Sequence, residues 1–396
     1  MQVISADSHI DTHWLPFDLF TSNATPPMKD RMPYVADTPQ GLKWVTHAGV
    51  SFGFAGGVGS TGKPYIKGSS HRADRMAEHG LYTPDSRKAH RLSDAQMRIE
   101  DQDTDGVTAE VLYGMLGASI WLRDPEAAWE MARIYNDWLV EFCAHSPNRL
   151  LGLSSIPTHD PKRAADEIRR VARQGGIKGL DVSGGEGRGM PLYHQDWADF
   201  WNAVDESGLP VHFHTLGPTN ARDMKGFSDL DVLRHRAEGL ANCQYDRACL
   251  VMRETILGGV LHAHPSIRLV LSESGIGWIP YMLERMDLGW EDQFRPFLEL
   301  DRKPSEYWFS QCHATYQTEM FGSRVIDAIG EDNVMWASDF PHPDGLWPDS
   351  MSYIEQQFKD VVPSVRNKVI GGNAAKLYGL VEDPRSALQA AEPVFN

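Results

Sequence analysis

The sequence is poor in cysteine, in long apolar runs and in basic residues. Its four cysteines are scattered and form no CxxC pair: Cys143, Cys243, Cys249 and Cys312. A disulfide framework is therefore not expected, and a reducing compartment suits the chain. No run of about 18 apolar residues could span a membrane. The first ten residues lack the basic and apolar regions of a signal peptide, so we expect a cytoplasmic protein.

The deficit of basic residues limits the possible partners. Lysine and arginine number 38 against 54 aspartates and glutamates, which gives a formal net charge of −16. A chain of this charge is not expected to bind nucleic acid or an anionic membrane. Hydrophobic residues make up 41%, which is enough for a large folded core. A small molecule is the expected partner.

Short apolar segments alternate with amphipathic helical segments along the chain. This alternation is typical of a parallel (β/α)8 barrel, known as a TIM barrel. We expect one such barrel over residues 1–381 and a C-terminal extension over 382–396. The eight expected strands cover residues 3–6, 106–113, 150–156, 177–182, 210–214, 268–272, 307–313 and 334–338.

One segment interrupts this rhythm. Residues 22–90, between the first two expected strands, are rich in glycine and proline and weakly periodic. So long an insert in a compact domain is usually functional. We expect it to be either a lid over the barrel mouth or a subunit interface, the latter in a homo-oligomer.

Histidines and carboxylates gather where the expected strands end. Asp7 and His9 stand two apart at the end of the first strand, so alternation puts them on one face. His214, Glu273 and Asp339 end the fifth, sixth and eighth strands. Each alone could be a helix cap or a surface acid. Because catalytic groups of such barrels lie at the C-terminal strand ends, the repetition predicts a shared metal site.

Four segments around these residues resemble the amidohydrolase superfamily, in the branch of aminocarboxymuconate semialdehyde decarboxylase and related metal-dependent enzymes: ADSHI, PVHFHT, SESGIGWIPYMLERMD and ASDFPHPD. The resemblance covers essentially the whole barrel. It implies that Asp7 and His9 are the strand-1 ligand pair, His214 the strand-5 ligand and Asp339 the strand-8 ligand.

Two positions depart from that pattern. Asp7 and Glu273 stand where the superfamily usually has histidines. Oxygen-rich ligand sets favour manganese or iron, although zinc stays open.

Three further residues are candidates with open alternatives. Glu110 stands in an otherwise apolar strand. If it faces the barrel interior, it is a further metal ligand; otherwise it faces a helix and pairs with an arginine. His342 is expected to orient Asp339 or to transfer a proton, or else to be a turn residue. His212 is expected to point away from the site, and His313 to face the mouth or to pack in the core.

The main functional hypothesis is a metal-dependent hydrolase or decarboxylase acting on a small, partly apolar substrate. It gives catalytic roles to Asp339, Glu273 and His342. A set of four carboxylates and two histidines, with Glu110 included, instead suits two ions and a dinuclear nonheme Fe or Fe/Mn monooxygenase. A third hypothesis is a non-catalytic barrel subunit.

Overall fold

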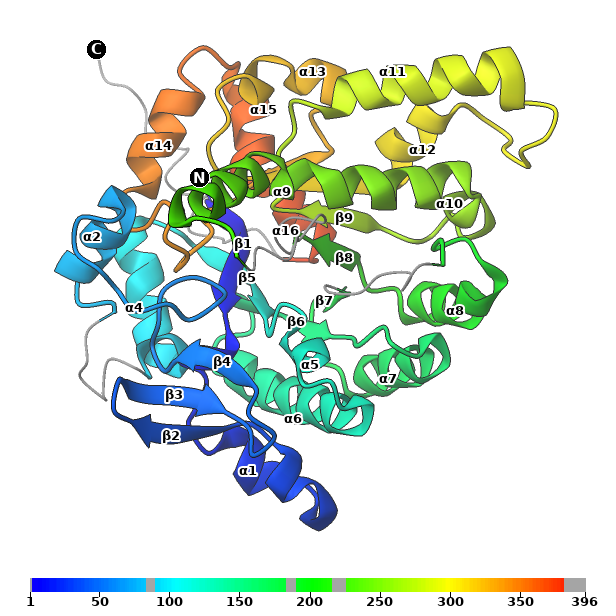
Figure 1. The fold of residues 1–396 in the computed structure, drawn as a ribbon. Helices are drawn as coiled ribbons and strands as arrows, with labels where there is room; N and C mark the ends of the chain where they lie inside the picture. The colour runs from blue at the N-terminus through cyan, green and yellow to red at the C-terminus, as the bar shows by residue number, and fades with distance from the viewer. Residues whose placement is uncertain (1, 83–89, 183–189, 216–225, 381–396) are drawn as a thin grey trace, which may run out of the picture.

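Eight parallel strands form a barrel in the computed structural model, which describes residues 2–82, 90–182, 190–215 and 226–380 (Figure 1). The barrel closes where β1 meets the segment after β11: His9 N donates to Phe340 O at 2.7 Å, and Asp339 N to Asp7 O at 3.0 Å. The predicted (β/α)8 fold is thus confirmed. In order round the barrel, the strands are β1 Ile4–Ile10, β5 Ala109–Gly114, β6 Leu150–Ser155, β7 Gly179–Asp181, β8 Val211–His214, β9 Leu269–Ser272, β10 Cys312–Tyr316 and β11 Val334–Trp336.

Helices connect and surround these strands. Two of them begin at a capping aspartate that is followed by proline: the carboxylates of Asp124 and Asp160 accept from backbone N–H groups of the first turn. None of the described helices is both long and apolar enough to cross a membrane. They are α4 Ala95–Asp105, α5 Ala118–Trp121, α6 Pro125–Ala144, α7 Pro161–Gln174, α8 Ala198–Ser207, α9 Asp229–Leu257, α10 Val260–Ala263, α11 Ile279–Gly289, α12 Pro304–Gln311, α13 Ile326–Ile329, α14 Ser350–Gln357, α15 Pro363–Asn367 and α16 Asn373–Leu377.

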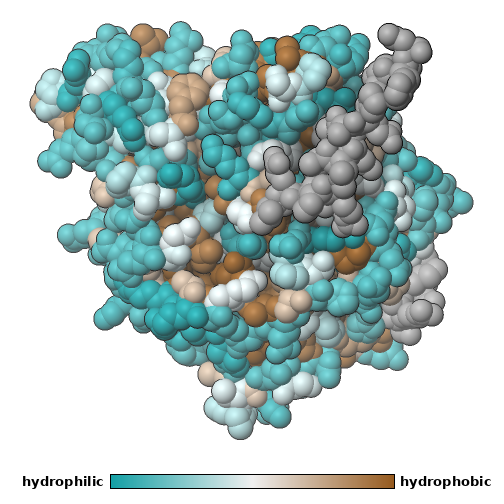
Figure 2. All heavy atoms as spheres, turned by 180° about the vertical axis from the view of Figure 1, so that it is seen from behind, coloured by the Kyte–Doolittle hydropathy of each residue, from teal (hydrophilic) through white to brown (hydrophobic). Residues whose placement is uncertain are grey.

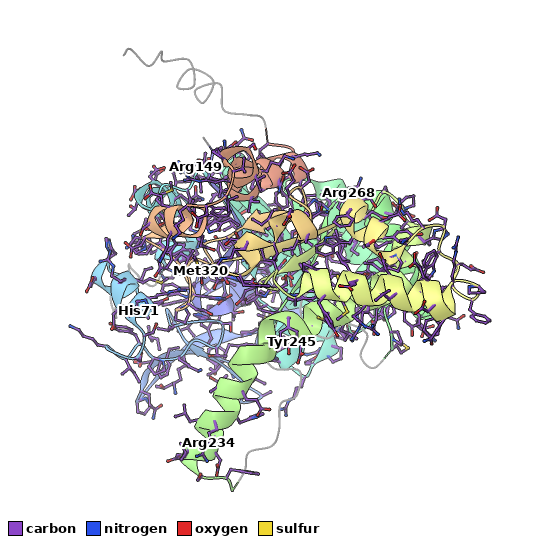
Figure 3. All side chains as sticks on the ribbon, turned by 90° about the horizontal axis from the view of Figure 1, so that it is seen from above. His71, Arg149, Arg234, Tyr245, Arg268 and Met320 are labelled. Atoms are coloured by element: carbon purple, nitrogen blue, oxygen red, sulfur yellow. The ribbon has the colours of Figure 1, made fainter. Side chains whose placement is uncertain are left out.

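Two features of the surface complete this picture. Helix α9 is 29 residues long. Its N-terminal part reaches away from the barrel, with Arg234 near the outer end (Figure 3). The face shown in Figure 2 is mostly hydrophilic, with apolar residues scattered among polar ones.

A β-bulge in β1 sets the site on an apolar base. The pairing of β1 with β5 shifts between Ser5 and Ser8, and the hydroxyls of these two serines lie 3.0 Å apart. Below the bulge, Ile4 and Ala6 pack with the apolar side chains of the other strands inside the barrel. Because the bulge adds one residue, Asp7 and His9 also face the interior above them.

The C-terminal helix closes the opposite end of the barrel. Ala374, Tyr378 and Leu380 belong to the same apolar cluster as the barrel interior. The Tyr378 ring stacks on that of His212, with centroids 5.9 Å apart. The expected extension over residues 382–396 lies outside the described residues.

The insert after β1 contains its own small sheet. Strands β2 Tyr34–Thr38, β3 Gly41–Val45 and β4 Ser51–Phe54 are antiparallel, between helices α1 Leu19–Asn23 and α2 His71–Glu78.

The part of the insert around α2 packs on the loop that follows β11. Ser70 Oγ donates to Pro343 O at 3.2 Å, and Tyr82 OH donates to Pro341 O. Met76 and Tyr82 share an apolar cluster with Phe340. Since this loop begins directly after Asp339, the insert lies beside the barrel mouth.

The strand expected at residues 307–313 is wrong. Residues 304–311 form helix α12, and β10 begins only at Cys312. Pro304 occupies the first turn, and Glu306 accepts from Lys303 N at 2.8 Å, which is a helix-start signal. His313 is consequently the second residue of β10 and does not reach the mouth, whereas Thr315 does.

Close packing of α6 on β6 gives a stability test. A Cβ at Gly152 would lie 2.8 Å from both Cys143 Sγ and Leu139 Cγ. We expect Gly152→Val to lower the free energy of unfolding by about 1–3 kcal/mol through overpacking. Urea denaturation measures it. For comparison, Gly289→Ala in α11 has no described atom within 4 Å of its new Cβ and should be neutral or slightly stabilising. Equal effects of the two changes would contradict this account.

Candidate metal centre

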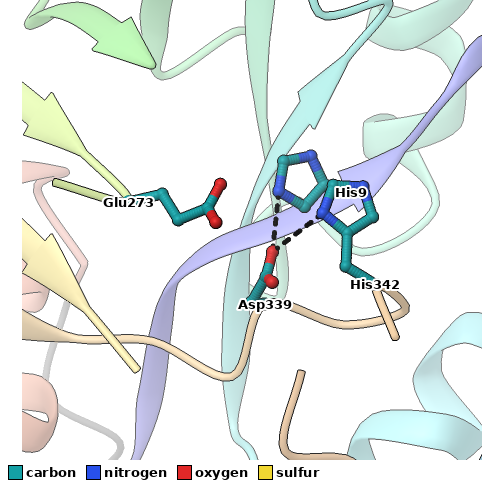
Figure 4. Close-up of side chains that lie close together, drawn as sticks. All are labelled: His9, Glu273, Asp339 and His342. Atoms are coloured by element: carbon teal, nitrogen blue, oxygen red, sulfur yellow. Dashed lines mark ion pairs between the residues drawn. The ribbon is translucent and has the colours of Figure 1, made fainter. Parts of the chain in front are cut away.

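The predicted ligands converge at the C-terminal end of the barrel. Two groups of side chains bring their ligand atoms within 4.8 Å of one another: Asp7, His9 and His214 form one, and His9, Glu273, Asp339 and His342 form the other. Figure 4 shows the second group, in which Asp339 contacts both His9 and His342. His9 belongs to both groups, so all six residues make one continuous cluster.

Short polar contacts link the members of this cluster. His9 Nε2 lies 3.0 Å from Asp339 Oδ1 and 3.3 Å from Asp7 Oδ1. On the other side, His214 Nε2 lies 3.5 Å from Asp7 Oδ1 and 3.4 Å from Glu273 Oε2. Asp7 Oδ2 accepts a hydrogen bond from Thr315 Oγ1 at 3.0 Å. The strand ends of β1, β8, β9 and β11 therefore meet at one point, as the sequence predicts.

Two of the carboxylates stand on strained backbone. Glu273 and Asp339 have φ angles of 49° and 54°, in the left-handed region that non-glycine residues seldom occupy. Hydrogen bonds hold both turns: Glu273 N donates to Thr315 Oγ1 at 2.8 Å, and Asp339 N donates to Asp7 O at 3.0 Å. Such strain costs on the order of 1–3 kcal/mol and is concentrated at functional sites.

Opposite charges compensate one another in the cluster. Burial acts to raise the pKa of Asp7, but His214 and His9 outweigh it and hold that pKa well below its usual range. Burial acts to lower the pKa of His214, but Asp7 and Glu273 raise it to about 10. For Glu273, burial and then the Asp339 charge raise the pKa well above the ordinary value. Glu273 is the carboxylate least compensated by its neighbours.

The cluster fits a divalent cation. Both oxygens of Asp339, Asp7 Oδ1 and both ring nitrogens of His9 are buried and have no hydrogen bond within the described part of the chain. Buried polar atoms are normally paired, so these five atoms need a partner. Carboxylate oxygens and imidazole nitrogens are the donors that zinc, manganese and iron take in proteins.

His342 and Asp11 extend the cluster toward the insert. His342 Nδ1 lies 3.2 Å from Asp339 Oδ1, and its Nε2 lies 2.9 Å from Asp11 Oδ2. Its ring stacks on His9 with centroids 3.9 Å apart. Asp11 is not among the residues predicted from the sequence, although its place two residues after His9 continues the alternation of Asp7 and His9.

His212 lies beneath the site, outside both groups of the cluster, and packs against Tyr113 and Tyr378 as expected. It faces the barrel interior like His214, one layer lower. Its Nδ1 lies 2.6 Å from the Tyr113 hydroxyl, which in turn lies 2.5 Å from Ser272 Oγ. Burial lowers the pKa of His212 to about 3, so the ring is neutral.

Glu110 is not part of the cluster, and its expected role as a metal ligand is wrong. Ala109, Val111 and Tyr113 pack inside the barrel, so alternation turns Glu110 outward to α4. There Arg98 Nε donates to Glu110 Oε1 at 2.6 Å, and Gln102 Nε2 donates to the same oxygen at 2.7 Å. The alternative of a helix-borne arginine partner is what the structure shows.

Comparison with known proteins identifies the class. The amidohydrolase family model matches residues 71–380, so the chain belongs to the amidohydrolase family. The superfamily resemblance predicted from the sequence motifs is confirmed. The protein is therefore an enzyme of that family.

Two curated relatives with similar sequences are decarboxylases. The chain is 29% identical over 263 residues to a gamma-resorcylate decarboxylase from Rhizobium radiobacter, an alignment that spans 64% of this chain and 78% of that protein. It is 23% identical over 303 residues to 2-amino-3-carboxymuconate-6-semialdehyde decarboxylase from Dictyostelium discoideum, which spans 74% of this chain and 79% of the relative.

Solved structures share the fold. A 5-carboxyvanillate decarboxylase from Novosphingobium aromaticivorans matches with a TM-score of 0.65 and 21% identity, covering 96% of each chain. An amidohydrolase from Mycobacterium avium subsp. paratuberculosis matches with a TM-score of 0.70 and 21% identity, covering 96% of this chain and 99% of that one. The decarboxylase relatives agree with the main functional hypothesis, not with the oxygenase or the non-catalytic one.

Metal retention tests the cluster directly. We expect His214→Ala and Asp339→Ala to weaken Mn²⁺ binding by more than the roughly 10–100-fold that follows loss of a residue supporting a ligand. Isothermal titration of metal-free protein with Mn²⁺ measures it. The exposed His145, which contacts Gln96 at 3.4 Å, provides the matched control His145→Ala. Unchanged affinity in both cluster variants would place the metal elsewhere.

Proposed function

We propose that this enzyme is a divalent-metal-dependent decarboxylase of a small aromatic carboxylic acid. The observation that carries the proposal is the buried cluster of three carboxylates and three imidazoles at the barrel mouth. The names of its relatives supply the substrate class: gamma-resorcylate, which is 2,6-dihydroxybenzoate, and 5-carboxyvanillate are both hydroxylated benzoates. A hydroxybenzoate is therefore the substrate to test first.

Asp7, His9, His214 and Asp339 are the residues that would hold the cation. His9 Nε2 is the atom that approaches both Asp7 and Asp339, and one nitrogen serves one ion. We therefore favour a single ion. Its oxygen-rich surroundings suit manganese, which is bound in three of the solved neighbouring structures. When bound, such a cation polarises oxygen atoms of the substrate as a Lewis acid.

The reaction needs one proton at one carbon. Breaking the bond between the ring and its carboxylate releases CO₂ and leaves an electron pair on the ring carbon, which a proton then takes up. Burial acts to lower the pKa of His342, but Asp339 and Asp11 outweigh it and hold that pKa well above the usual range. His342 consequently holds a proton beside Asp339. We assign the transfer to the ring carbon to Asp339, which receives the proton from His342 and passes it to the carbon.

Glu273 is suited to bind a substrate oxygen. Its side chain is 11% exposed, more than that of any other member of the cluster. It is therefore the member best placed to contact a substrate. Burial raises its pKa well above the ordinary value, so the carboxyl keeps its proton at higher pH than a surface glutamate. A protonated carboxyl donates a hydrogen bond to a substrate oxygen.

The proposed reaction has a direct assay. Mn²⁺-loaded enzyme incubated with 2,6-dihydroxybenzoate and other hydroxybenzoates should release CO₂ and the corresponding phenol. In D₂O the product should carry deuterium at the carbon that bore the carboxylate. Asp339→Asn should lower kcat by about 100-fold or more, because proton transfer by a positioned group contributes at least that much. Asp301→Asn, at an exposed side chain, is the control.

Two outcomes would contradict the proposal. A requirement for dioxygen would favour the oxygenase hypothesis, and full activity after exhaustive chelation would exclude the metal. Product analysis under nitrogen and Mn²⁺ add-back after chelation distinguish these cases.

A further inference from the structure

A completely buried arginine lies just outside the barrel wall. Arg98, on α4, has 0% of its side chain exposed. Its Nε and Nη2 form a two-pronged contact with Glu110 on β5, at 2.6 and 2.7 Å. Gln102, one turn further along α4, donates to Glu110 Oε1 at 2.7 Å. The carboxylate thus neutralises the guanidinium and fixes its plane, as a bidentate pair does.

The rest of this guanidinium points toward the metal cluster. Arg98 Nη1 donates to the backbone oxygen of His9 at 2.9 Å, and Nη2 contacts the backbone oxygen of Phe340 at 3.4 Å. The guanidinium also lies 4.7 Å from the centre of the Phe340 ring. The Arg98 side chain therefore donates four hydrogen bonds to three segments of the chain: β5, β1 and the loop after β11.

The two carbonyls belong to functionally placed residues. His9 is the ligand shared by both groups of the cluster, and Phe340 directly follows Asp339. His9 N also donates to Phe340 O at 2.7 Å. Strand β11 ends at Trp336, and beyond it the loop meets β1 only through an isolated parallel bridge between Ser8 and Phe340. Arg98 adds hydrogen bonds to both segments at this bridge.

We propose that Arg98, held by Glu110, is a positioning residue of the metal centre. It fixes the backbone of His9 relative to that of Phe340, and so sets the distance between the His9 imidazole and the Asp339 carboxylate. It touches neither substrate nor cation. Lysine cannot replace it, because a single ammonium lacks the planar fork that reaches a carboxylate and two carbonyls together.

The inference rests on the metal centre of the proposed function, but its test needs no turnover. Mn²⁺ titration of metal-free protein should show Arg98→Lys binding about 10-fold or more weakly than wild type, the usual size for loss of a group that orients a ligand. Glu110→Gln should weaken binding in the same direction, because it removes the counter-charge of Arg98 at nearly constant volume.

Another arginine near α4 provides the matched control. Arg91 pairs with Asp101 of α4, whose side chain is 1% exposed, while 17% of the Arg91 side chain is exposed. It also donates to His79 O at 2.8 Å. Arg91→Lys thus disturbs a comparable ion pair that does not involve His9 or Phe340. We expect it to leave Mn²⁺ affinity within about twofold of wild type, less than the effect of removing a supporting group.

A spectroscopic signature separates positioning from general destabilisation. Co²⁺-substituted Arg98→Lys and Glu110→Gln should show altered visible absorption bands, whereas Arg91→Lys should keep those of wild type. The free energy of unfolding of the three metal-free variants measures how much stability each substitution removes. This loss is then compared with the change in the spectra. Wild-type affinity and spectra in both Arg98→Lys and Glu110→Gln would overturn the proposal.

Two further outcomes are decisive. If Arg98→Lys does not fold, Glu110→Gln carries the test with the same readouts. If wild type binds Mn²⁺ tightly yet decarboxylates no substrate, the proposed function fails while the positioning role is still measured.

Discussion

The carboxylates of Asp7, Glu273 and Asp339 stand at the mouth of a barrel whose interior is otherwise largely apolar. They cannot all be ionised there without positive charge close by, because burial and mutual repulsion both favour the neutral form. His9, His214 and His342 interleave with them and compensate part of that charge. A cation bound here would couple folding to metal binding, because it would also remove the cost of bringing these side chains together.

A buried ion pair, Arg98 with Glu110, lies outside the barrel wall and is separate from the cluster. Arg98 and Glu110 neutralise each other outside the barrel wall, with β1 and β5 between them and the cluster. A guanidinium inside the mouth would pair with the carboxylates and compete with a cation. By acting through backbone carbonyls, Arg98 supports the site without adding charge to it.

Sequence patterns predicted the barrel and the convergence of Asp7, His9, His214, Glu273 and Asp339, because strand ends of a parallel barrel share one face. They could not show whether the Glu110 side chain faces the barrel interior or the surrounding helices. Barrel strands are buried on both sides, so its apolar neighbours carried no sign of which side is the interior. The boundary of β10 was misplaced for a related reason: α12 is as aromatic as a strand, with Tyr307, Trp308 and Phe309 in its middle. Propensity alone favours a strand there, and only its capping residues indicate a helix.

The meeting of the two ends of the chain has a consequence for how the protein is made. Ser5 hydrogen-bonds to Ser338 across 333 positions of sequence, and the barrel floor beneath Ile4 includes Ala374 and Tyr378. During synthesis, β1 emerges before the other barrel strands and has an unpaired edge until the segment after β11 has been translated. Such long-range pairing slows folding and leaves open edges exposed to other chains. The residues that complete the cluster at the mouth also complete the barrel, so a chain interrupted before residue 339 would have neither a closed sheet nor the full cluster.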